Sequence, residues 1–192
     1  MKKTLLLIAF VCIVLGVNAQ QKPTDLDKSP MDMSYWPANY PILKLNGKVK
    51  DAPTARIIYS RPQKNNRTIF DGIVKYNEMW RLGANEATEI EFFKNVKIGN
   101  KAIEKGRYTL YCLPAADKWT IVVSNDNYSW GNYSYDIKKD VTRADAKVEK
   151  NPDVVENFTI YFEETKTGAN LIMLWDDVKA TLPISLAATP AK

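Results

Sequence analysis

Histidine is absent from this sequence of 192 residues, and its absence removes several kinds of chemistry. Serine and cysteine nucleophiles that depend on a histidine base are excluded. Most zinc, copper and iron sites are excluded as well, because imidazole is a principal ligand in them. Carboxylates alone are able to hold calcium, but the sequence has no Asp-x-Asp-x-Asp-Gly loop. We therefore expect neither a metal site nor a cofactor.

Long hydrophobic runs are also missing, with one exception at the start of the chain. Two lysines precede an apolar run from Thr4 to Val17, and small residues follow up to Ala19. This pattern predicts a secretory signal peptide at residues 1–19, cleaved after Ala19. The run is too short for a stable transmembrane helix. Cys12 lies inside the run and not at the cleavage point, so we expect an exported protein of the periplasm or the extracellular space that is neither a lipoprotein nor membrane-spanning.

Cysteine is scarce, and the predicted cleavage leaves only Cys112. An internal disulfide is then impossible, although an exported protein would tolerate one. Cys112 follows Tyr108 and Leu110 in an alternating apolar pattern, without a basic neighbour. Such a thiol stays protonated. We interpret Cys112 as a buried small side chain and not as a nucleophile.

A strong excess of one charge is missing too. The predicted mature chain has 192 − 19 = 173 residues, and its charge is (27 − 2) − 22 = +3. This small net charge differs from the clustered positive surface of a nucleic-acid-binding protein, so we expect no nucleic-acid partner. A chain of this length is sufficient for one domain with a sizeable core.

The predicted mature chain divides into three parts. Residues 20–52 contain several prolines, which exclude a long helix, yet they carry enough aromatic and aliphatic residues to be ordered from about residue 29. We expect an extended segment there. Residues 53–186 would form a single domain, and residues 187–192 a frayed tail.

From residue 54 onward, apolar residues recur at every second position. We expect strands near 54–60, 87–93, 107–113 and 118–124, a hairpin around Gly99-Asn100, and further strands from 142 to 184. Asn151-Pro152 and Thr167-Gly168 predict turns between the later strands. The pattern indicates an all-β protein, an antiparallel β-sandwich of jelly-roll type with at most one or two short helices.

Three segments interrupt this alternation and are the candidates for function: Tyr59–Pro62, Trp80–Glu89 and Trp130–Asp136. Arginine guanidinium groups bind anions in a fork, a carboxylate serves as acid, base or acceptor, and Trp and Tyr rings stack on sugars. The candidate ligand-binding residues are Arg61, Arg81, Asn85, Glu86, Trp130 and Tyr135. The catalytic residues, if there are any, stay unknown.

A structural interpretation of the same segments stays open beside the functional one. Trp80 would fill the core, Arg81 would pair with Glu86 or Glu89, and Asn85 would brace a tight turn. The segment at Trp130 would then be a long loop held by buried aromatic rings. Sequence spacing does not decide between a site and a structural corner.

The same segments resemble a known family. The residues that carry the resemblance are Ser29-Pro30-Met31-Asp32, Tyr59-Ser60-Arg61-Pro62, Ile69-Phe70, Trp80-Arg81-x-Gly83-Ala84-Asn85-Glu86-Ala87-Thr88-Glu89, Gly106-x-Tyr108-x-Leu110 and Trp130-Gly131. They are similar to the domain-of-unknown-function family 2911 over about residues 29–165. The resemblance implies a secreted or envelope protein of bacteria, and it brings no activity, cofactor or substrate.

We carry three hypotheses about function forward from the sequence. The leading one is an exported domain that binds a small polar ligand or a glycan at one end of the sandwich. The second is a hydrolase that uses Glu86 with Asp136 or Tyr135. The third is a structural or interaction module of the cell envelope. Ligand identity and oligomeric state stay open.

Overall fold

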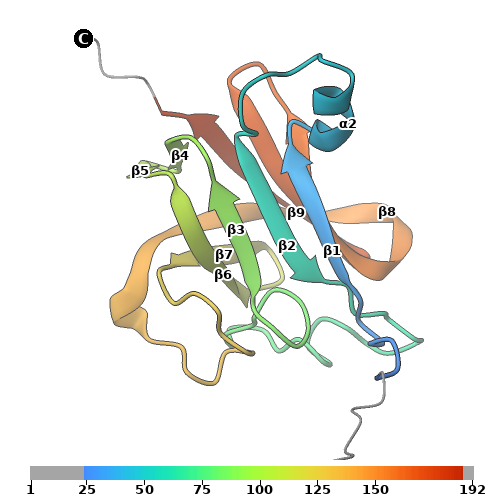
Figure 1. Cartoon of the computed structure of the whole chain (residues 1–192). Coiled ribbons are helices and arrows are strands. Elements are labelled where there is room, and N and C mark those ends of the chain that lie inside the picture. The colour runs from blue at the N-terminus through green and yellow to red at the C-terminus, as the bar shows by residue number, and fades with distance from the viewer. Residues whose placement is uncertain (1–23, 188–192) are drawn as a thin grey trace, which may run out of the picture.

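Residues 24–187 are described by a computed structural model, shown in Figure 1. The predicted signal peptide at residues 1–19 and the last residues of the predicted tail, 188–192, lie outside the described part. In the described chain no helix has both the length and the apolar character needed to cross a membrane.

Within the described residues, nine strands form one antiparallel sheet with the order β1-β2-β3-β6-β7-β8-β9-β4-β5. The prediction of a mainly antiparallel β fold is confirmed, and the strands expected in two sheets are connected by hydrogen bonds into one. The strands are β1 (Met31–Trp36), β2 (Ala55–Ser60), β3 (Thr88–Phe92), β4 (Val96–Ile98), β5 (Lys101–Ile103), β6 (Gly106–Pro114), β7 (Lys118–Ser124), β8 (Asp140–Glu164) and β9 (Gly168–Leu186).

The alternating residues form strands because one face of each strand is buried. In β3, Ile90 and Phe92 lie in the core, whereas Glu89 and Glu91 lie half-exposed on the outer face. A slip of one residue would exchange these faces, so the apolar pattern fixes the register. The segment that precedes the predicted domain contributes β1, which pairs with β2 at one edge of the sheet.

Only two short helical turns accompany the sheet in the described chain: α2 (Tyr40–Leu45) and the 3-10 turn η1 (Ile137–Lys139). This agrees with the predicted one or two short helices. Cys112 is fully buried in β6, as expected, and burial raises the pKa of its thiol. It is therefore an inert part of the core.

The long β8–β9 hairpin bends sharply in its middle. Lys150 pairs with Val178 and Val155 pairs with Asp176, so four residues of β8 face a single residue of β9. The predicted turn at Asn151-Pro152 is wrong, because the chain continues in β8 through a bulge. Pro152 has no N–H for a ladder hydrogen bond, and such residues are tolerated at bulges.

This bend folds the far half of the hairpin back over the inner face of the sheet. The rings of Trp36 and Phe162 stack at 6.2 Å, and Phe158 meets Tyr59 edge-on at 6.0 Å. One sheet therefore encloses the core from both sides, as the two sheets of a sandwich do. Figure 1 shows β8 and β9 curling behind β1 and β2.

Candidate functional site

The candidate site is a cavity of about 290 Å³ beside the long loop that joins β2 to β3. This loop lies at the end of the sheet where β2 terminates (Figure 1). Polar and aromatic side chains line the cavity, and we call it the arginine cavity. Its lining residues are Ser29, Pro62, Arg67, Ile73, Val74, Trp80, Arg81, Gly83, Ala84, Asn85 and Trp175.

The backbone of residues 80–88 is held firmly around Arg81. The Trp80 indole donates to the Gly83 carbonyl at 3.0 Å, and the Thr88 hydroxyl donates to the Leu82 carbonyl at 2.6 Å. Leu82 and Asn85 adopt left-handed backbone geometry, with φ of 53° and 57°. Asn85 therefore takes the left-handed position of a tight turn, and Trp80 fills the core. The turn fixes the base of the Arg81 side chain.

Arg81 itself makes no ion pair with any residue in 24–187. Its Nε is buried and has no hydrogen-bond partner there. The predicted pairing of Arg81 with Glu86 or Glu89 is wrong, because Glu86 is exposed and Glu89 lies 3.8 Å from Arg107. A buried donor without an acceptor costs roughly 1–3 kcal/mol. Arg81 is therefore held in place without compensation from the protein.

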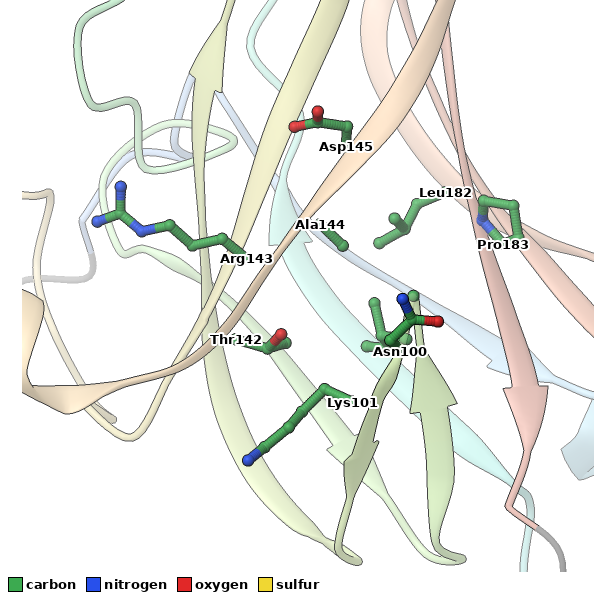
Figure 2. A pocket seen from close by; sticks show the side chains of 10 residues that line it. Asn100, Lys101, Thr142, Arg143, Ala144, Asp145, Leu182 and Pro183 are labelled. Atoms are coloured by element: carbon green, nitrogen blue, oxygen red, sulfur yellow. The ribbon is translucent and has the colours of Figure 1, made fainter.

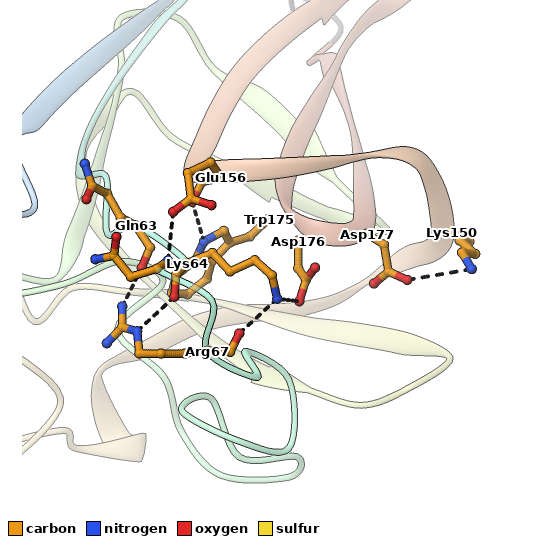
Figure 3. A network of polar contacts seen from close by, with 9 residues as sticks. Gln63, Lys64, Arg67, Lys150, Glu156, Trp175, Asp176 and Asp177 are labelled. Carbon is orange, nitrogen blue, oxygen red and sulfur yellow. Dashed lines mark hydrogen bonds and ion pairs between the residues drawn. The ribbon is translucent and has the colours of Figure 1, made fainter.

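Arg67 is the second cation of the cavity, and its guanidinium is positioned by backbone carbonyls (Figure 3). Its Nε donates to the Lys64 carbonyl at 2.9 Å, and its Nη2 donates to the Gln63 carbonyl. The Lys64 ammonium in turn bonds Asp176 at 2.7 Å, which ties the loop to the bend of the β8–β9 hairpin. These contacts fix Arg67 without neutralising its charge.

The arginine cavity is electrostatically one-sided. Arg67 and Arg81 bring two positive charges, and among residues 24–187 no carboxylate lines the cavity. Asn85 adds an amide that donates and accepts hydrogen bonds, and Trp80 and Trp175 form an aromatic wall. Guanidinium groups pair with carboxylates and phosphates in a bidentate manner. The arrangement therefore suits a small anion with an apolar or sugar-like body.

Arg61 lies outside this cavity and has a structural role. It donates to the Asp32 carboxylate at 2.9 Å, the Phe158 carbonyl at 3.2 Å and the Thr159 hydroxyl at 2.8 Å. Arg61 thus connects β1 to the folded-back half of β8. It does not join Arg81 as a second anion fork.

Asn85, Glu86 and Trp130 come together through a short backbone ladder. Glu86 pairs with Trp130, and Gly131 donates its N–H to the Asn85 carbonyl at 2.9 Å. Side chains alternate along such a ladder. Asn85 lines the arginine cavity, whereas Glu86 lines a separate cavity of about 270 Å³ with Met31, Ile58, Ala87, Glu89, Tyr128 and Ser129.

Trp130 is 62% exposed and stacks on Tyr133, so the prediction of buried rings that hold this loop does not apply to it. Tyr135 does hold the loop: its ring packs on buried Tyr111 at 5.1 Å. The Tyr135 hydroxyl bonds Asp140 at 2.7 Å and accepts from Arg143 at 2.6 Å. Burial, together with Asp140, raises the pKa of Tyr135 to about 12.

The structure does not bring Glu86 together with Asp136 or Tyr135, the pairs that the hydrolase hypothesis requires. Asp136 accepts from the backbone N–H of Lys138 at the start of η1, and Tyr135 is engaged by Asp140 and Arg143. Neither residue lines the cavity that Glu86 lines. In the described chain, no group of three or more acidic or thiol side chains forms a potential metal site.

Sequence reasoning missed Arg67 and Trp175. Arg67 follows Asn65 and Asn66, which both adopt left-handed geometry, with φ of 49° and 56°. The Asn-Asn pair predicts a turn, but nothing in the sequence indicates that the turn reaches Arg81. Trp175 lies 175 − 80 = 95 positions after Trp80, about half of the chain, and their rings stack at 6.0 Å only because the β8–β9 hairpin bends.

The fold and the cavity define a mainly antiparallel β domain with a cationic cavity at one end. Residues 41–184 match the family described as "Protein of unknown function (DUF2911)", and the chain belongs to this family. The predicted resemblance is confirmed. A comparison with curated proteins and a comparison with solved structures each find no match.

Proposed function

We propose that this protein is an exported domain that binds a small polar ligand carrying an anionic group in the arginine cavity. One observation carries the proposal: Arg67 and Arg81 line the same cavity, neither makes an ion pair in residues 24–187, and no described carboxylate lines the cavity. A ligand carboxylate or phosphate supplies the opposite charge to these two guanidinium groups. An acidic sugar combines such a group with hydroxyls for Asn85.

The cavity favours binding over turnover. Its volume of about 290 Å³ is at the lower limit for small-molecule sites, which is roughly 300 Å³. Arg67, Arg81 and Asn85 donate hydrogen bonds, and none of them is a ready nucleophile or a general base at neutral pH. These residues recognise charge and shape, which is the task of a binding site.

The test is thermal unfolding in the presence of D-glucuronate, glucose 1-phosphate, acetate and sulfate, with neutral glucose as the matched ligand. Binding at a hundred times Kd adds about 2.7 kcal/mol, which raises Tm by roughly 5–10 °C for a domain of this size. We expect at least one anion to give this increase in the wild type. The Arg81→Gln variant should need at least about tenfold more ligand for the same increase.

Arg107→Gln is the control, because Arg107 lies on the outer face near Glu89 and Glu91 and lines no part of the arginine cavity. It should respond to the anion as the wild type does. The proposal fails if no anion raises Tm beyond sodium chloride of equal ionic strength. It also fails if Arg81→Gln and the wild type respond alike.

A further inference from the structure

A second cavity, which shares no lining residue with the arginine cavity, lies between the β4–β5 hairpin and the first residues of β8 (Figure 2). Its volume is about 630 Å³. We call it the strand slot, because strands bound it. Its lining residues are Ile98, Gly99, Asn100, Lys101, Thr142, Arg143, Ala144, Asp145, Leu182 and Pro183.

The strand slot exists because β8 and β9 separate. Their pairing ends at Lys147 and Thr181, and β9 next pairs with β4 from Ile184 onward. Pro183 lies at this change of partner and has no N–H to continue the ladder with β8. The β4–β5 hairpin enters the resulting fork. A Cβ on Gly99 would lie 3.9 Å from the Cβ of Ala144, so the hairpin turn closes one end of the slot.

Two strand edges that have no partner in the described residues border this slot, β8 through residues 142–145 and β5 through Lys101. In residues 24–187, β5 pairs only with β4, and residues 140–146 of β8 pair only with β7. Each edge presents backbone N–H and C=O groups at alternate residues. An edge of this kind binds an extended peptide by adding it as a further strand. Here one added strand would bond on both sides and close the gap between β5 and β8.

The charges around the slot determine which charge a bound peptide should carry. Arg143 pairs with Asp140 at 2.8 Å, and Asp145 pairs with Lys118 at 2.8 Å, so these charges are already compensated. Lys101 makes no ion pair with the described residues, and Figure 2 shows its side chain extending from β5 beside Thr142. The slot therefore has one uncompensated positive charge.

Apolar side chains form the inner wall. Ile98 and Leu182 are buried and line the slot together with Ala144. Side chains of a strand alternate between two faces, so an added strand would place apolar residues against this wall. A carboxylate on the added strand would lie beside Lys101.

We propose that the strand slot binds an extended acidic peptide segment of a partner protein by strand addition between β5 and β8. The segment alternates apolar and other residues and has a carboxylate for Lys101. Backbone hydrogen bonds provide the affinity, and the Lys101 pair and the apolar wall provide the specificity. This interaction is independent of the arginine cavity.

The experiment uses the full mature protein and a fluorescein-labelled peptide of the sequence Thr-Val-Glu-Val-Glu-Val-Thr, followed by fluorescence anisotropy. Two further peptides have N-methyl groups on one or the other alternate set of residues, which removes the donors toward one edge. We expect the unmodified peptide to bind and each N-methylated peptide to bind at least tenfold more weakly. Hydrogen exchange should slow at 101–103 and 142–145 when the peptide binds.

Two variants test the charge. Lys101→Glu should weaken binding at least fivefold, whereas Lys50→Glu, an exposed lysine before β2, should leave it unchanged. Equal binding of the unmodified and N-methylated peptides, or no binding up to millimolar concentration, overturns the proposal. Self-association of Lys101→Thr on gel filtration, without peptide binding, also overturns it, since Lys101 would then only protect an edge strand.

Discussion

Two arginines that look equivalent in the sequence have opposite roles at the scale of single residues. Arg61 satisfies three acceptors on two strands, whereas the Nε of Arg81 has no partner in the described chain. Hydrogen bonds of a charged group contribute to stability when both partners are present, and a buried donor without a partner reduces it. Arg61 therefore stabilises the fold, and Arg81 is retained at a cost.

Replacement of each arginine by methionine keeps the apolar stem and removes the charge. Arg61→Met should lower the free energy of unfolding by about 2 kcal/mol, because it removes bonds of a charged donor. Arg81→Met should change it by less than about 0.5 kcal/mol, or raise it, as substitutions at functional sites often do. Urea unfolding of the two variants measures the difference. Equal losses would contradict the distinction.

At the scale of the elements, the bend of the β8–β9 hairpin determines how the sheet encloses the core. Gly168 is the residue at which the folded-back half of the hairpin contacts the rest of β9. A Cβ at this position would lie 2.1 Å from the Ile184 carbonyl oxygen. That oxygen belongs to backbone that pairs with β4, so it has little freedom to move. Only glycine permits this approach of the two parts of β9.

Gly168→Ala should therefore lower the free energy of unfolding by roughly 1–3 kcal/mol, the usual range for overpacking. The control is Lys166→Ala in the same hairpin turn, where the side chain is exposed. Thermal unfolding of both variants measures the effect, and the control should match the wild type within about 0.5 kcal/mol. A Gly168→Ala variant as stable as the control would show that this contact is loose.

Individual strands could be predicted from the sequence, and their arrangement could not. Period-two alternation and turn residues are local signals, so the hairpin at Gly99-Asn100 and the turn at Thr167-Gly168 were predicted where the structure has them. The prediction of a turn at Asn151-Pro152 was wrong because a proline is compatible with a β-bulge as well as with a turn. Arg67 and Trp175 join the arginine cavity through contacts far apart in sequence, which periodicity does not report.

The lack of histidine governs how the whole molecule responds to pH. The Lys139 ammonium bonds Asp126 and lowers the pKa of that carboxyl, and Lys118 does the same for Asp145. A lowered carboxyl pKa adds stability above the unfolded value near 4, and this stability is lost as pH falls further. Burial raises the pKa of Tyr59 to about 12, which adds stability below pH 10 that is lost as pH rises toward 12.

We therefore expect Tm to be flat from about pH 6 to 9 and to fall below about pH 4 and above about pH 10. Thermal unfolding from pH 3 to 11 at constant ionic strength measures the profile. Tyr59→Phe should reduce the alkaline loss, whereas Tyr133→Phe, at an exposed ring, should leave it unchanged. A step in Tm between pH 6 and 8 would contradict the expectation.

The stacking of Trp36 on Phe162 joins residues 162 − 36 = 126 positions apart. Contacts of such long range require the chain to search a large volume before they form, and proteins rich in them fold in milliseconds to seconds. Trp36, Tyr59 and Trp80 each pack against an aromatic ring in the last quarter of the chain, either Phe158 or Phe162. A ribosome that is still making this protein therefore holds an incomplete hydrophobic core until synthesis is nearly finished.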